Sequence, residues 1–171
     1  ESDGEGKGST FRVKLPIAAV HREKHSEPIA RQRLPDQPSL DGVRVLVLED
    51  EDDSRDVLRL LLEGCGATVV ACEDAKLGLR ALDSAENGKF DIIISDVGMP
   101  EMDGFAFIRT VRARPAAQGG NIPAVALTAY TRSQDRTPAL LAGFQAHVPK
   151  PADPDELLAV VASMLGRLVP S

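Results

Sequence analysis

Residues 43–53, Val-Arg-Val-Leu-Val-Leu-Glu-Asp-Glu-Asp-Asp, decide the fold expected for this chain. The first six form a short apolar run, and the last five are acidic. A helical stripe follows, made of Val57, Leu58, Leu61, Leu62 and Cys65. Gly64 and Gly66 mark the end of that helix. A strand followed by an amphipathic helix is the repeating unit of a parallel α/β sheet.

The same alternation continues along the rest of the chain. Further strands are expected at 67–72, 90–95, 123–128 and 145–148. Helices are expected at 75–87, around 105–111, within 132–142, and from Pro154 onward with Asp153 as its N-cap. Pro138 predicts that the fourth helix starts late or is kinked, with 131–137 mobile. Five strands alternating with five helices predict a doubly wound parallel sheet with helices on both faces.

The residues before this pattern have a different character. Residues 9–15 alternate apolar and polar side chains as a strand does, whereas 17–41 is rich in proline and mixed charge and is expected to be a flexible linker. Residues 1–40 carry seven basic and six acidic residues, and 41–171 carry 13 basic and 20 acidic ones. We therefore expect three parts: a short remnant of another domain at 1–16, a linker at 17–41 and one complete domain at 42–169.

The composition of the whole chain excludes several classes of protein. Its 171 residues have a net charge of −6, and no apolar run approaches the roughly 20 residues of a membrane span. The acidic balance and the lack of tryptophan argue against a nucleic-acid partner. Cys65 and Cys72 are expected to be core residues rather than disulfide or zinc ligands. We expect a soluble, cytoplasmic protein without membrane contact, and the start at Glu1 suggests a fragment.

Reactive side chains follow the predicted strands at their carboxyl ends. Glu49 and Asp50 follow the first strand, Asp96 the third, Thr128 ends the fourth, and Lys150 follows the fifth. Ligands of doubly wound sheets bind at this edge. Taken singly, an acidic run before a helix serves the helix dipole, and a lysine before proline is solvated. Their joint occurrence at strand ends favours one site.

A hard cation would suit such a group of carboxylates. Like charges raise one another's pKa unless a cation neutralises them, and oxygen ligands with several carboxylates favour Mg²⁺. The cation would offset charge on a phosphoryl group attacked by a carboxylate, while Lys150 and Thr128 would contact other phosphoryl oxygens. An aspartate would then accept phosphate.

At these residues the chain resembles the receiver domain of two-component response regulators. The matching segments are VLVLEDEDDSR (45–55), DIIISDVGMPEMDGF (91–105), AVALTAY (124–130) and GFQAHVPKP (143–151). The resemblance implies a flavodoxin-like sheet of strand order 2-1-3-4-5. It also implies site roles: Asp96 as phosphoacceptor, Asp50 as Mg²⁺ ligand, Glu49 as the second acidic position, usually acting through water, the Gly98 carbonyl as third protein ligand, Thr128 as switch hydroxyl and Lys150 as phosphate-pairing lysine.

Besides Pro138 in the expected fourth helix, two positions depart from the family pattern. The family often has aspartate where Glu49 stands, so the metal shell is one methylene looser and the metal affinity is in question. His147 stands where many members carry a rotating aromatic ring. It is expected either to move with Thr128 and respond to pH, or to be a partly exposed strand residue.

The amino-terminal residues carry a second resemblance. GEGKGSTFRVKLP (4–16) is similar to the last glycine box and final strand of the ATPase domain of sensor histidine kinases. With the linker, this implies the carboxyl-terminal part of a hybrid histidine kinase; the alternative is a plain glycine-rich tail. Gly4, Gly6 and Gly8 lack the rest of a nucleotide pocket, so we expect no ATP binding by this fragment.

The expected function is that of a phosphorylation-driven switch. Asp96 would take a phosphoryl group from the phosphohistidine domain of a histidine kinase, and the surface of the fourth helix, fifth strand and fifth helix would change. A histidine phosphotransfer domain is a further possible partner, and the fragment is not expected to be an enzyme toward other substrates. The alternatives are a phosphatase of the haloacid dehalogenase type, with Asp50 as nucleophile, and a degenerate receiver used only for docking.

Overall fold

The computed structural model describes residues 38–84, 89–129 and 136–167 of the chain. Its strands are β1 (Arg44–Leu48), β2 (Thr68–Cys72), β3 (Ile92–Asp96), β4 (Ala124–Thr128) and β5 (Ala146–Pro149). Its helices are α1 (Asp52–Gly64), α2 (Ala75–Asp83), α3 (Gly104–Arg112), α4 (Arg136–Ala142), α5 (Pro154–Met164) and the short 3-10 helix η2 (Ala116–Gln118). The strand expected at 9–15, most of the expected linker and residues 131–135 lie outside the described residues.

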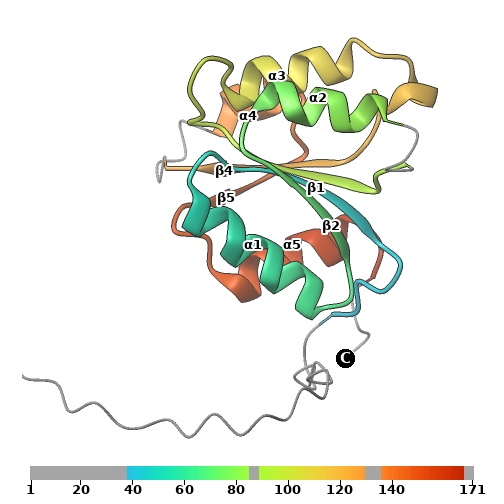
Figure 1. Ribbon diagram of the computed structural model, residues 1–171, viewed down its shortest axis with the longest axis vertical. Helices are drawn as coiled ribbons and strands as arrows, with labels where there is room; N and C mark the ends of the chain where they lie inside the picture. Colours follow the sequence, from blue (N-terminus) through green and yellow to red (C-terminus); the bar gives the residue numbers. More distant parts are fainter. Residues whose placement is uncertain (1–37, 85–88, 130–135, 168–171) are drawn as a thin grey trace, which may run out of the picture. The chain divides into compact units, whose positions relative to one another are not determined.

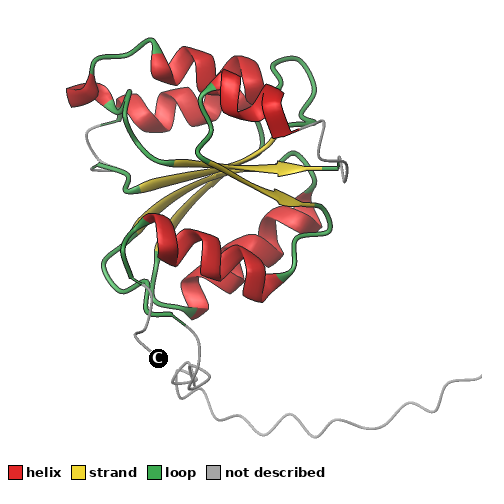
Figure 2. Ribbon diagram, turned by 180° about the vertical axis from the view of Figure 1, so that it is seen from behind, coloured by secondary structure: helices red, strands yellow, loops and turns green. Residues whose placement is uncertain are grey.

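The predicted sheet is confirmed. Five parallel strands are ordered β2-β1-β3-β4-β5. Helices α1 and α5 cover one face, and α2, α3 and α4 cover the other (Figures 1 and 2). The order reverses between β1 and β3, so the carboxyl ends of these two central strands lie at the switch point where doubly wound sheets bind ligands.

Strand alternation builds a separate core on each face. In β1, Val45 and Val47 join the core under α1 and α5, and Leu46 and Leu48 join the core under α2, α3 and α4. The same period of two runs through β3 and β4, which are buried along their whole length. The predicted burial of both cysteines is confirmed: Cys65 packs in one core and Cys72 in the other, and both are free thiols.

Aspartate side chains begin three of the helices. The predicted N-cap Asp153 is confirmed, because its carboxylate accepts from the amides of Asp155 and Glu156, each at 3.0 Å. Asp74 caps α2 and Asp103 caps α3 in the same way. The Asp103 cap fixes the start of α3 directly after the loop that follows β3.

Several local expectations change in the structure. Val57 was expected on the buried stripe of the first helix, but 61% of it is exposed, because α1 buries the stripe formed by Leu58 and Leu62 instead. Leu40, which the sequence placed in the linker, is fully buried, and its amide donates to the Cys65 carbonyl at 2.8 Å. Pro138 lies in the first turn of the described helix α4, where a missing N–H costs no intrahelical bond.

Two element ends also differ from expectation. Helix α2 ends at Asp83, earlier than the expected end near 87, and residues 85–88 lie outside the description. Strand β5 runs one residue further than expected, to Pro149, and the Lys150–Pro151 peptide bond that follows is cis. None of the described helices combines the length and the apolar character needed to cross a bilayer.

Candidate functional site

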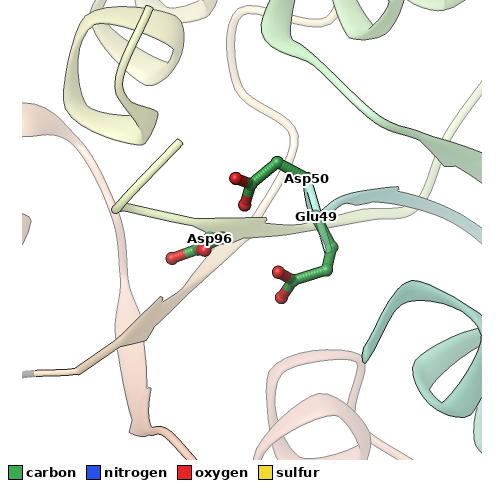
Figure 3. A group of neighbouring side chains, drawn as sticks. All are labelled: Glu49, Asp50 and Asp96. Carbon is green, nitrogen blue, oxygen red and sulfur yellow. The ribbon is translucent and has the colours of Figure 1, made fainter. Parts of the chain in front are cut away.

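The parallel strands deliver the predicted site residues to one edge of the sheet. Asp96 and Thr128 are the last residues of β3 and β4, and Glu49 and Lys150 come directly after β1 and β5. Oxygen atoms of Glu49, Asp50 and Asp96 lie within 4.8 Å of one another. Figure 3 shows these three side chains. The structure therefore brings together carboxylates that are about fifty residues apart in the sequence.

The three carboxylates differ sharply in burial. Glu49 is fully buried and Asp96 is 6% exposed, whereas Asp50 is exposed. In Figure 3 the side chains of Glu49 and Asp50 leave the end of β1 in different directions. Burial raises the pKa of the Glu49 carboxyl, and the hydrogen bond and charge of Lys150 oppose that rise without cancelling it.

Lys150 bridges the two buried carboxylates. Its Nζ lies 2.8 Å from Asp96 Oδ2 and 2.9 Å from Glu49 Oε1 and donates a hydrogen bond to each. Glu49 Oε2 is 2.7 Å from the same ammonium, within ion-pair distance but without hydrogen-bond geometry. Burial lowers the pKa of Lys150, but the hydrogen bonds to Asp96 and Glu49 outweigh it and raise the pKa.

The backbone after β3 holds Asp96 in place. The amide of Gly98 donates to Asp96 Oδ1 at 2.8 Å, so each carboxylate oxygen of Asp96 has a donor. Gly104 packs against the same residue: a Cβ there would lie 2.3 Å from the Asp96 carbonyl oxygen. Gly104 lies within the segment 91–105 that resembles the family, but the need for glycine comes from this tertiary contact, which no local pattern indicates.

The two expected switch residues lie on β4 and β5. Thr128 is 7% exposed, and its carbonyl accepts from the Lys150 amide at 2.7 Å, which joins it to the site through the backbone. His147 is half-buried and stands opposite Ala126 in the sheet register. It therefore lies two residues before Pro149, the register partner of Thr128.

The donor set fits a hard divalent cation. Three carboxylates and one ammonium leave the group with two formal negative charges. Carboxylate oxygens from Asp50 and Asp96, with Glu49 alongside, are the ligands that Mg²⁺ takes in proteins, and a partly exposed site lets the ion keep waters. The exposed carboxylate of Asp50 is the one most open to such an ion.

A groove of about 250 Å³ opens beside the site between α1 and the loop after β5. Its wall includes Glu49 and Lys150 together with apolar side chains such as Val57, Leu58 and Ala152. A somewhat larger cavity of about 290 Å³ lies at the opposite edge of the sheet, around Phe90 and Ile122, and none of the predicted site residues lines it. The larger cavity and the predicted site residues therefore lie at different ends of the sheet. Because Glu49 and Lys150 line the smaller groove, we place the candidate site there.

The chain is similar in sequence to known proteins. An uncharacterized 14.6 kDa protein of Leptolyngbya boryana is 46% identical over 117 residues, which cover 68% of this chain and 86% of that protein. The response regulator MprA of Mycobacterium sp. (strain KMS) is 35% identical over 128 residues, which cover 75% of this chain. Those residues are 53% of MprA, so the chain matches about half of that relative's length.

Solved structures agree with the sequence relatives. The chemotaxis response regulator CheY4 of Vibrio cholerae matches with a TM-score of 0.65 at 30% identity, over 72% of this chain and 98% of that one. A receiver domain of a signal transduction histidine kinase from Syntrophus aciditrophicus matches with a TM-score of 0.64 at 29% identity, over 72% and 90%. The family model of the response regulator receiver domain matches residues 45–162. The chain belongs to the response regulator receiver domain family.

Proposed function

We propose that this domain accepts a phosphoryl group from phosphohistidine onto Asp96, assisted by Mg²⁺, Thr128 and Lys150. One observation carries the proposal: the nearly buried Asp96 carboxylate lies between the Gly98 amide and the Lys150 ammonium, each at 2.8 Å, beside two further carboxylates. The Lys150 ammonium lies near enough to this carboxylate to contact the oxygens of a phosphoryl group attached to it.

The transfer itself needs few groups. A carboxylate oxygen of Asp96 forms the new O–P bond as the N–P bond of phosphohistidine breaks, and the electron pair of that bond returns to the imidazole. Lys150 then shifts its hydrogen bonds to the phosphoryl oxygens, and Thr128 donates its hydroxyl to another. Bound Mg²⁺ offsets the negative charge that gathers on the transferring group. Asp50, Asp96 and the Gly98 carbonyl would hold the ion, with Glu49 at the remaining acidic position.

The readout of phosphorylation is a shift in population. The phosphoryl group carries about two negative charges in place of the single charge of the free carboxylate, and this draws Lys150 and Thr128 toward Asp96. We infer that the surface of α4, β5 and α5 changes as a result, with His147 on β5 within the moving region. Partners that bind this surface then distinguish the two states.

Phosphorylation by acetyl phosphate tests the proposal. The wild-type protein should gain one phosphoryl group by intact mass with Mg²⁺ and none with EDTA, and Asp96→Asn should gain none. Asp53→Asn is the matched control, because Asp53 is an exposed acid near the site that lies outside the carboxylate cluster. Label on Asp96→Asn would count against Asp96 as the acceptor, and label at Asp50 with turnover of a phosphate ester would show the phosphatase chemistry instead. No labelling of the wild type would indicate a domain used only for docking.

The parent protein is proposed to be a hybrid histidine kinase. The glycine-rich residues 4–16 resemble the end of a kinase ATPase domain, and the Syntrophus structure shows that such receivers occur in histidine kinases. A phosphohistidine domain of that kinase, or a separate histidine phosphotransfer domain, would then be the donor or the next acceptor. Incubating the phosphorylated domain with each purified histidine domain and following the loss of label from Asp96 would identify the partner and the direction of transfer.

A further inference from the structure

Residues 39–41 form a strap at the amino edge of the sheet, although the sequence places them in the linker. Leu40 is fully buried and packs in the core under α1 and α5. Its carbonyl accepts from the Val43 amide at 3.0 Å. The Ser39 hydroxyl donates to Asp41 Oδ2 at 2.8 Å. The chain therefore enters the core in a defined turn before β1 begins.

One side of the strap closes the end of α1. This helix ends in a Schellman turn, in which Gly66 has a φ of 97° and the amides of Gly66 and Ala67 donate back into the last turn at 3.0 and 3.1 Å. The carbonyl of the C-cap residue Cys65 accepts from the Leu40 amide at 2.8 Å. The strap thus supplies a donor to one of the last carbonyls of α1.

The other side of the strap meets the end of α5. This helix also ends in a Schellman turn: Gly166 has a φ of 65°, and the amides of Gly166 and Arg167 donate to the carbonyls of Ser163 and Ala162 at 3.1 and 2.7 Å. The turn fixes the backbone of Arg167, whose Nη1 donates to the Asp41 carbonyl at 2.7 Å. Two residues that are 126 positions apart therefore meet at the strap.

The strap bridges the ends of the two helices that cover one face of the sheet (Figure 1). Its attachments to the two helices differ. The Leu40 side chain lies inside the core, whereas the hydrogen bond from Arg167 to Asp41 lies at the surface, where water competes for both partners. Contacts with little buried area open locally at a lower free energy than the core does. The attachment to α5 is therefore the one expected to open and close.

We propose that the strap couples the residues that precede it to the carboxyl end of α5. The backbone before residue 38 reaches the domain through the strap, so a displacement of that chain acts first on Leu40 and Asp41 and loosens the end of α5. Because a coupling free energy is reciprocal, a change in α5 shifts the strap in return. This return direction rests on the proposed function, since α5 belongs to the surface expected to change on phosphorylation.

Hydrogen exchange of backbone amides tests the contact with α5. Arg167→Met keeps the aliphatic stem and removes the donor to Asp41, so the Leu40 amide should exchange at least about threefold faster. Amides of β3, which exchange by global unfolding, should stay within about twofold. Arg59→Met is the matched control, because Arg59 pairs with Asp56 within α1. An unchanged Leu40 rate, or equal acceleration at Leu40 and in β3, would overturn the proposal.

Leu40→Ala tests the coupling from the strap to α5. The amides of Gly166 and Arg167 should exchange at least about threefold faster in this variant, because they exchange by local opening of the helix end. Leu127→Ala is the control: it removes the same atoms from the same core at the carboxyl end of β4, and it should leave both rates within about twofold. Equal effects of the two variants would contradict the proposal. Leu40→Val with Leu127→Val repeats the comparison with a smaller loss of stability, so the test does not depend on folding of the alanine variants.

Phosphorylation tests the return direction. In the wild type, labelling with acetyl phosphate and Mg²⁺ should change the exchange rate of the Leu40 amide by at least about threefold, and Arg167→Met should reduce this change to less than about 1.5-fold. Label at Asp96 without a change at Leu40 would overturn the return direction. The first two experiments use no phosphodonor, so their failure leaves Asp96 phosphorylation standing. A protein that takes no label refutes the proposed function and the return direction with it, and leaves the strap standing.

Discussion

The two edges of the sheet each hold a partly buried cation, but they surround it with opposite kinds of acceptor. At the amino edge, Arg112 donates to the carbonyls of Gly143 and Gly120, at 2.9 and 3.0 Å, and to the Gln145 side-chain carbonyl at 3.0 Å. At the carboxyl edge, Lys150 donates to two carboxylates, and a third lies beside them. The cation at the amino edge is hydrogen-bonded by neutral oxygens, whereas the carboxyl edge has more negative than positive charge.

The difference in acceptors indicates that the amino edge has a structural role and that the carboxyl edge carries the reactive groups. The Arg112 contacts join the end of α3 to the turn before β5. The Arg112 contacts at the amino edge therefore stabilise the fold. Burial lowers the pKa of the Arg112 guanidinium. The carboxyl edge holds like charges close together, which costs stability until a cation or a new arrangement of Lys150 relieves the repulsion.

Gly104→Ala should have the largest effect, because it breaks the backbone packing of the carboxyl edge. The new Cβ would lie 2.3 Å from the Asp96 carbonyl oxygen, which is backbone and cannot rotate away. We expect the free energy of unfolding to fall by more than about 3 kcal/mol, measured by urea denaturation. Gly64→Ala in α1 is the control, since no atom lies within 4 Å of its Cβ position, and it should leave stability unchanged or slightly higher.

Arg112→Met should have the next largest effect and act on the amino edge alone. It removes three hydrogen bonds of the guanidinium while keeping the aliphatic stem, so stability should fall by about 2–3 kcal/mol. Mg²⁺ affinity should stay within about twofold of the wild type, because the two edges are independent. Arg109→Met, at an exposed position of the same helix, is the control. A large loss of Mg²⁺ affinity in Arg112→Met would mean that the edges are coupled.

Asp50→Asn should stabilise the metal-free protein while removing most of its response to metal. The substitution relieves repulsion with Asp96 and Glu49, which should add about 0.5–1 kcal/mol to the free energy of unfolding in EDTA. The rise in Tm that Mg²⁺ causes in the wild type should largely disappear. Asp53→Asn should keep that rise. A variant less stable than the wild type in EDTA would show that the carboxyl edge is not under repulsion.

The smallest effect concerns pH. Burial raises the pKa of Glu49 above its usual 4.5, so between the two values the folded protein binds a proton that the unfolded chain has released. The free energy of unfolding in EDTA should therefore fall as pH rises from 4.5 through the folded pKa. Glu49→Gln should lack this part of the decline. A constant difference between wild type and variant across that range, by urea titration at several pH values, would contradict the assignment.

The fold was largely predictable because its decisive signals are local. The apolar run of β3 and the N-cap at Asp153 lie within a few residues of the structure they determine. Val57 shows where local signals stop: an apolar residue at helical spacing was expected to be buried, but α1 buries Leu58 and Leu62 and leaves Val57 exposed. Helical spacing alone does not tell which part of an apolar stripe faces the sheet.

The sequence predicted which residues lie together at this edge, but it did not predict how they contact one another. Strand ends alone placed Glu49, Asp96 and Lys150 at one edge, because parallel strands end together. The sequence could not show that Glu49 pairs with a lysine 101 residues away, nor that Gly104 must be glycine because of the Asp96 carbonyl. Both contacts exist only once strands and loops have packed.

Chemical trapping of the phosphorylated residue tests the central claim most directly. Borohydride reduces an aspartyl phosphate to homoserine, so treating the phosphorylated protein and mapping its peptides identifies the acceptor. The account predicts homoserine at position 96 and at no other position, formed only when Mg²⁺ was present during phosphorylation. Homoserine at position 50, or a stable phosphate on a serine or threonine, would contradict it.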